Sequence, residues 1–182
     1  MSEPNYMRNL SLLVVLFVCA VGVVSGQDPP APPREFVSEE FGFKAVYPAA
    51  PEYRVEKGGV HYFSVTVGGQ MFSVSVLRLT GEWQRAFETK LARTYDLNQD
   101  AYIKGAEGKL LGTKEVKIGN LPARELTHTV GKDWRATTRM VFSGGRLFYI
   151  TAVTLVDLTR YRQLKADAFV QSFQLIPGKP AK

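Results

Sequence analysis

Basic side chains that could bind an anion gather between residues 124 and 139. Arg124, Lys132, Arg135 and Arg139 stand there on strands predicted to be neighbours. A guanidinium group matches a carboxylate or a phosphate with its planar fork of donors. Arg135 and Arg139 share one face of their strand, because strand side chains alternate. Two uses stay open. An internal ion pair, with Glu125 as the partner of Arg139, is favoured over a weak site for an anionic ligand or a partner, which would use these four residues and His128.

The two histidines offer little catalytic chemistry. His128 shares a strand face with Leu126, while Glu125 points to the other face, which disfavours a Glu–His pair within that strand. His61 ends an apolar row, and we expect a packed side chain rather than a ligand. The competing hypothesis is a small hydrolase or ligand-binding enzyme, with a site between helix and sheet that uses His128, Arg124 or Arg139.

Other motifs for catalysis or cofactor binding do not occur. The sequence contains no Gly-x-Ser-x-Gly nucleophile turn. Its glycine-bearing stretch 105–112 lacks the lysine and hydroxyl residue of a phosphate-binding loop. Histidines and carboxylates show no spacing typical of metal ligands. Trp134 alternates away from Arg135, so no platform for stacking nucleic-acid bases is assembled. We therefore predict no catalytic residues, no metal, no cofactor and no nucleic-acid partner.

The N-terminus predicts export. An apolar run of about 15 residues, shorter than the ~20 that span a bilayer, follows Arg8 and precedes Val24-Ser25-Gly26. This layout is typical of a signal peptide covering residues 1–26. The only cysteine, Cys19, lies inside it, and the bulky Val18 before it disfavours lipidation. We expect a periplasmic, cell-surface or secreted protein without disulfides. An uncut leader, tethering a structural protein to the membrane, is the alternative.

The rest of the chain predicts one domain. Residues 27–35 form a proline-rich linker, expected to be extended. Residues 36–177 make a single domain, long enough for a full core, and 178–182 a disordered tail. The net charge of +6 is ordinary for solubility but also suits anionic surfaces.

Glycine pairs locate two hairpins. Gly68–Gly69 joins strands 60–67 and 70–79, with Val65 opposite Phe72 and Phe63 opposite Val74. Gly144–Gly145 joins strands 134–143 and 146–155, with Val141 opposite Phe148. Further strands are predicted at 43–47, 110–118 and 123–130.

Apolar residues at helical spacing predict two helices, at about 82–96 and 158–173. The mixed, polar stretch 97–108 predicts a loop. This order of elements is typical of an α+β fold with a mainly antiparallel sheet flanked by helices. We expect both hairpins and both helices to share one apolar core that leaves no room for a reacting group.

Several short stretches resemble the PsbP/Mog1-like α/β/α sandwich superfamily, including small exported proteins. They are Phe41-Gly42-Phe43 before Tyr47-Pro48, Gly108–Gly112, Leu121–Leu126, Arg146–Tyr149 and Ala168–Phe173. The usual Pro-Gly-Arg-Glu is here Pro122-Ala123-Arg124-Glu125. The resemblance covers residues 36–176 and implies a central antiparallel sheet between helices. The better-known members act as binding or assembly factors and have no common set of catalytic residues. Neither of their activities carries over to this chain, because no partner-binding motif of either type occurs in it.

These observations together predict an exported, non-enzymatic binding or assembly module that acts on a protein or cell-envelope partner.

Overall fold

The computed structural model describes residues 32–56, 58–156 and 160–177. The predicted leader, most of the linker and the predicted tail lie outside the described residues.

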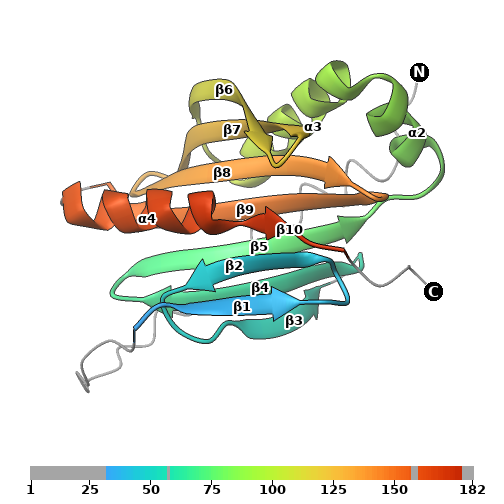
Figure 1. Ribbon diagram of the computed structural model, residues 1–182. Coiled ribbons are helices and arrows are strands. Elements are labelled where there is room, and N and C mark those ends of the chain that lie inside the picture. The colour runs from blue at the N-terminus through green and yellow to red at the C-terminus, as the bar shows by residue number, and fades with distance from the viewer. Residues whose placement is uncertain (1–31, 57, 157–159, 178–182) are drawn as a thin grey trace.

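A seven-stranded antiparallel sheet is the centre of the fold (Figure 1). Its spatial order is β3-β4-β5-β9-β8-β7-β6. The strands are β3 Glu52–Glu56, β4 Val60–Val67, β5 Gln70–Arg78, β6 Leu110–Ile118, β7 Leu121–Val130, β8 Trp134–Ser143 and β9 Arg146–Leu155. Both hairpins have the predicted register, with Val65 opposite Phe72 and Val141 opposite Phe148. The glycine turns therefore fix which side chains share a face.

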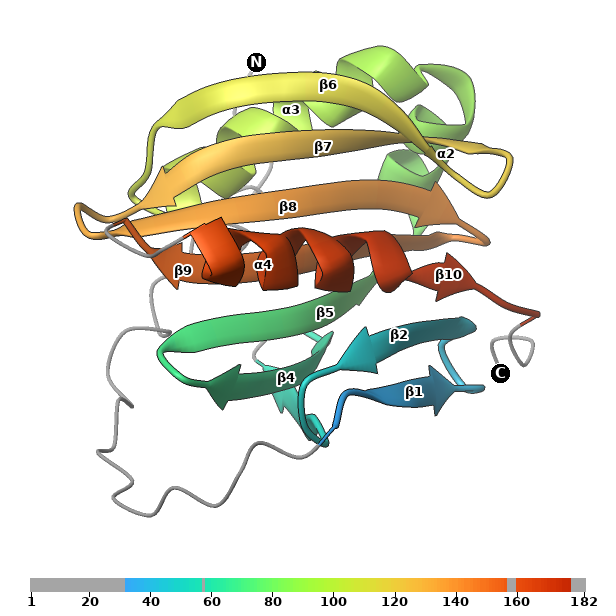
Figure 2. The same ribbon diagram turned by 60° about the vertical axis from the view of Figure 1, so that its left-hand side comes forward.

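Each face of this sheet has its own covering layer (Figure 2). Helices α2 Gly81–Thr89 and α3 Leu91–Gly105 lie on one face. The other face carries α4 Arg160–Ser172 and a three-stranded sheet of order β1-β2-β10, built from β1 Arg34–Ser38, β2 Phe43–Tyr47 and β10 Gln174–Leu175. We call these the α3 face and the α4 face. The α+β prediction is confirmed, while β1, β3 and β10 were not predicted.

Two cores, one on each face, replace the predicted single core. Along β9, Phe148 packs in the cluster on the α4 face, and its neighbour Tyr149 packs in the cluster on the α3 face. The prediction of one core was wrong because the central strands are apolar on both sides, which requires cover on both.

The first predicted helix is two helices, which meet at Lys90 in a non-helical conformation. The expected loop over 97–108 was also wrong, because α3 continues to Gly105. Polar residues there are bonded inside the protein: Asn98 donates to the Thr94 carbonyl, and Gln99 accepts from Thr113. Polar residues whose hydrogen bonds are made inside the protein give a helix the same composition as a loop, so the sequence alone does not distinguish the two.

Gly108 lies where α3 gives way to β6. A Cβ at this position would overlap the Thr129 carbonyl oxygen, so a side chain cannot fit without moving the backbone. Lys109 donates its backbone N–H to the Thr129 hydroxyl, and Thr129 donates its own N–H to the Lys109 carbonyl. These bonds fix the start of β6 beside the end of β7.

Candidate functional site

The five residues predicted to form a weak anion or partner site do not come together. Arg124 and His128 point to the α3 face, because they align with Met140 and Ala136. Arg135 and Arg139 point to the α4 face, and Lys132 lies exposed in the turn between β7 and β8. The sheet separates the two pairs, so the expectation of one cluster was wrong. Side chains on adjacent strands come together only when they point to the same face of the sheet.

Arg139 forms the predicted internal ion pair. Its Nε donates to Oε2 of Glu125 at 2.7 Å, and Lys114 reaches Oε1 of the same carboxylate at 2.6 Å. Burial opposes ionisation of Glu125, but the hydrogen bonds from Lys114 and Arg139 prevail and lower its pKa. This carboxylate is therefore an ionised link across three strands, with both oxygens occupied.

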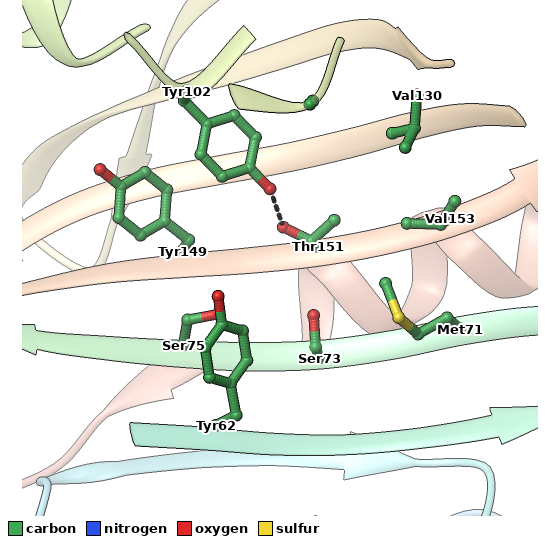
Figure 3. Close-up of a pocket in the computed structure, with 10 residues that line it drawn as sticks. Tyr62, Met71, Ser73, Ser75, Tyr102, Val130, Tyr149, Thr151 and Val153 are labelled. Atoms are coloured by element: carbon green, nitrogen blue, oxygen red, sulfur yellow. Dashed lines mark hydrogen bonds between the residues drawn. The ribbon is translucent and has the colours of Figure 1, made fainter. Parts of the chain in front are cut away.

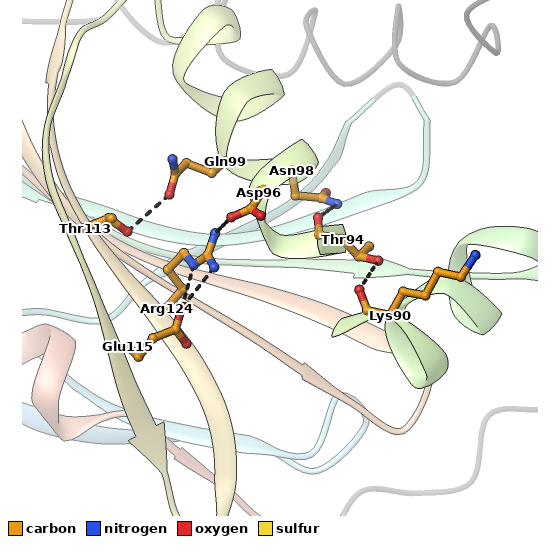
Figure 4. Close-up of polar contacts among 8 residues, drawn as sticks. All are labelled: Lys90, Thr94, Asp96, Asn98, Gln99, Thr113, Glu115 and Arg124. Atoms are coloured by element: carbon orange, nitrogen blue, oxygen red, sulfur yellow. Dashed lines mark hydrogen bonds and ion pairs between the residues drawn. The ribbon is translucent and has the colours of Figure 1, made fainter. Parts of the chain in front are cut away.

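Arg124 on the α3 face is also held by two ion pairs, here as a cation between two carboxylates (Figure 4). Its guanidinium donates to Asp96 of α3 at 2.5 Å and to Glu115 of β6 at 2.9 Å. The cation also lies 5.6 Å from the centre of the Tyr95 ring. Burial opposes the charge, but the two carboxylates raise the pKa of Arg124. Neither carboxylate was predicted as a partner, because the docking of α3 against β6 and β7 is not visible in the sequence.

A small pocket lies between α3 and the sheet (Figure 3). Its volume is about 50 Å³, against roughly 300–1,000 Å³ for sites that enclose a drug-sized ligand. It has room for a few water molecules, since each needs about 10–15 Å³. It is lined by Tyr62, Met71, Ser73, Ser75, Tyr102, Ala106, Val130, Tyr149, Thr151 and Val153. The pocket was not predicted, although Ser73 and Ser75, which alternate along β5, are the sequence signal that could have indicated it.

A chain of hydrogen bonds runs from this pocket to His128. Tyr102 contacts Thr151 at 3.0 Å, Thr151 contacts Thr138 at 3.1 Å, and Thr138 contacts Nε2 of His128 at 3.0 Å. Nδ1 of His128 lies 3.0 Å from the Thr129 carbonyl, which can only accept. The neutral ring therefore carries its proton on Nδ1, and Nε2 accepts.

The number of hydrogens that each hydroxyl can donate then sets the direction of every hydrogen bond between Tyr102 and His128. Thr138 gives its hydrogen to His128, so Thr151 donates to Thr138 and Tyr102 donates to Thr151. His128 is 1% exposed, and burial lowers its pKa although the bond to Thr129 opposes this. Both ring nitrogens are occupied. The histidine is therefore held inside the protein, with Nε2 as a hydrogen-bond acceptor.

His61 packs as predicted. Its ring centre lies 4.5 Å from that of Phe41, and Nδ1 is 2.8 Å from the Tyr53 hydroxyl. Burial lowers its pKa, with a weaker opposing effect from Glu40. Among the residues with a described position, no group of three or more histidine, cysteine, aspartate or glutamate side chains could hold a metal ion.

Apolar residues reach the surface together at one end of the sheet. Val130, Trp134 and Leu155 are neighbours across β7, β8 and β9 on the α3 face. Leu110 and Leu111 start β6, and Val156 follows β9. Exposed fractions run from 36% for Leu155 to 50% for Leu111, while Val130 and Trp134 are half-buried. We name these six residues the strand-end patch. It is the feature of the structure that best fits a binding role.

Comparison with known proteins bears on the fold alone. No family model matches the sequence, and no curated protein matches it. The solution structure of cyanobacterial PsbP from Synechocystis aligns over 85% of this chain and 98% of its own, with 15% identity and a TM-score of 0.54. The chain has a PsbP-like fold. This confirms the architecture that the resemblance implied.

LpqN of Mycobacterium tuberculosis, described as involved in cell envelope biogenesis, aligns with 13% identity over 82% of this chain and 87% of its own, at a TM-score of 0.40. That score is too low to add to the PsbP-like assignment. Among the described residues, no helix is long and apolar enough to cross a membrane.

Proposed function

We propose that this protein is an exported, non-enzymatic binding or assembly module that acts on a protein or another component of the cell envelope. One contrast supports it. The groups best suited to catalysis, His128, Arg124 and Glu125, are consumed by internal partners, whereas apolar side chains collect in the exposed strand-end patch. Exposed apolar groupings of this kind mark interaction sites.

The enzyme hypothesis receives less support from the geometry. It requires His128, Arg124 or Arg139 to face a shared cleft, but Arg139 lies across the sheet from the other two. The pocket next to them is lined by hydroxyl and apolar groups, with Tyr102 between it and His128. The membrane-tether alternative depends on the leader, outside the described residues.

Site-specific photo-cross-linking in the source cell tests the proposal. A photoreactive amino acid at position 155 places the probe in the strand-end patch, and the same amino acid at position 97 gives a matched control. Leu97 is a comparably exposed leucine, 44% against 36%, in helix α3. We expect a discrete adduct with an envelope component from position 155 and none from position 97.

Equal labelling from both positions, or none from positions 110, 134 and 155 alike, would contradict the proposal. An N-terminal sequence of the natural protein checks the export component separately, because cleavage before Gln27 leaves a released domain.

A further inference from the structure

We propose that the strand-end patch binds the surface of an anionic lipid bilayer. This inference rests on the proposed function and names the envelope component. The patch extends across the ends of β6, β7, β8 and β9, which lie at the same end of the molecule (Figure 2). A row of strand ends can meet a flat surface without a groove.

Its side chains have the composition of interfacial segments. The amphipathic indole of Trp134 lies between two aliphatic side chains, Val130 on β7 and Leu155 on β9. Tryptophan is enriched at the level of lipid headgroups, and leucine and valine gain by entering the acyl boundary. The pocket adds to this apolar surface, because Val130 belongs to both.

Cations surround the patch. Lys104 lies in the last turn of α3, Lys109 precedes β6, Lys132 lies in the β7–β8 turn, and Arg135 follows Trp134; all four are exposed. Of the described residues beside the patch, Glu107 and Asp133 are exposed acids. Long basic side chains can keep their charge at the headgroups while their stems lie over apolar surface. The excess of cations favours an anionic bilayer over a neutral one.

Three backbone N–H groups at this end are already paired. Gly131 donates to the Ala106 carbonyl at 3.2 Å, Thr129 to Lys109 at 2.9 Å, and Val156 to Asp133 at 2.9 Å. Polar backbone groups are costly to bring into lipid unless they have partners. These bonds between elements lower the cost of bringing this end of the sheet against lipid.

Tryptophan fluorescence can test the contact directly. The chain has two tryptophans, Trp83 and Trp134, so the full-length Trp83→Phe variant reports on Trp134 alone. The probe is vesicles of phosphatidylcholine and phosphatidylglycerol in equal parts, with phosphatidylcholine vesicles for comparison. We expect a blue shift of Trp134 emission and quenching by lipids brominated near the headgroup, both with the anionic vesicles and weakened by salt.

Two pairs of substitutions in the Trp83→Phe chain separate the patch from the apolar leader, which could itself bind vesicles. Leu155→Asp should abolish the quenching of Trp134, while Leu97→Asp, with the same charge change, should not. Lys132→Glu changes the charge of the patch by two units, and each unit at an anionic surface changes membrane partition about fivefold. The vesicle binding that quenches Trp134 should therefore weaken about thirtyfold. Lys90→Glu, far along the chain from the patch, should have a much smaller effect.

Vesicle binding without a blue shift or quenching of Trp134 would overturn the inference, because attachment would then come from elsewhere in the chain. Equal effects of Leu155→Asp and Leu97→Asp would overturn it as well. If Trp134 stays unquenched while position 155 still cross-links to a protein in cells, the lipid inference fails and the proposed function stands. If neither occurs, both fail.

Discussion

The two faces of the central sheet are stabilised differently. On the α4 face, Phe43 stacks on Phe173 with ring centres 5.7 Å apart and contacts Phe63 at 5.2 Å, in a core dominated by aromatic rings. On the α3 face, tyrosine and threonine hydroxyls, His128 and a small pocket lie between α3 and the strands. Aromatic packing distinguishes the α4 face, which also carries the Glu125 ion link. The α3 face has an apolar cluster too, but adds hydrogen bonds whose donors and acceptors must match. Substitutions on the two faces should therefore differ in size and in their response to pH.

The largest effect is expected for Phe43→Ala. Phe43 is fully buried, and the cavity left in the aromatic core should cost about 3–5 kcal/mol of unfolding free energy. Urea unfolding measures the loss. A cost near 1 kcal/mol would show that the small sheet contributes little to stability.

Neighbouring residues on β7 allow a direct comparison of the faces. Glu125→Gln should cost about 2–3 kcal/mol, because it leaves Arg139 partly buried without its ionic partner. Arg124→Gln should cost only about 1 kcal/mol, because Asp96 and Glu115 have side chains 65% and 68% exposed and remain solvated. Urea unfolding of both variants at pH 7 decides the order, and equal costs would contradict this account of the faces.

The α3 face should weaken in acid through His128. Burial lowers the pKa of His128 in the folded protein, so the unfolded chain takes up a proton first. The contribution of neutral His128 is complete above the unfolded pKa of 6.5 and is lost as pH falls below it toward the lowered folded pKa. The slope reaches at most about 1.4 kcal/mol per pH unit.

Thermal unfolding of wild type and His128→Gln between pH 7.5 and 5.5 measures this contribution. We expect the substitution to flatten the pH dependence. His61→Gln is the matched control, because the pKa of the more accessible His61 is lowered as well, and it should flatten the curve less. A His128→Gln curve parallel to wild type would show that the buried ring does not titrate in this range.

A small effect, similar to that of Arg124→Gln, is expected for Tyr102→Phe. The change removes the first donor of the hydroxyl chain but leaves the bond from Thr138 to His128 in place, so the cost should be about 1 kcal/mol. Proton-detected NMR of His128 can check the direction of the chain. The assignment requires a hydrogen on Nδ1 in the neutral ring, and a hydrogen on Nε2 would reverse the derived order of donors.

Short-range patterns in the sequence predicted much of this fold. The Gly68–Gly69 and Gly144–Gly145 turns gave the registers of both hairpins, and alternation then placed His128 away from Glu125 and paired Glu125 with Arg139. These features depend on residues in one hairpin or on adjacent strands. The polar face of α3 was missed because burial converts Asn98 and Gln99 from loop-like residues into bonded ones.

Longer-range features could not be predicted. β10 has two residues and pairs with β2 from the far end of the chain, and no local pattern identifies so short a strand. Asp96 reaches Arg124 only because α3 packs across β7. The strand-end patch likewise joins residues from four strands.

The sequence by itself determined the strands of the two hairpins, their turns and the face that each of their side chains takes, because strand geometry repeats every two residues. Only the tertiary structure decided which layer covers each face, which charges meet across elements and where apolar groups stay exposed. Those outcomes depend on the packing of segments far apart in the chain, where the energy of each contact is set by all its neighbours together.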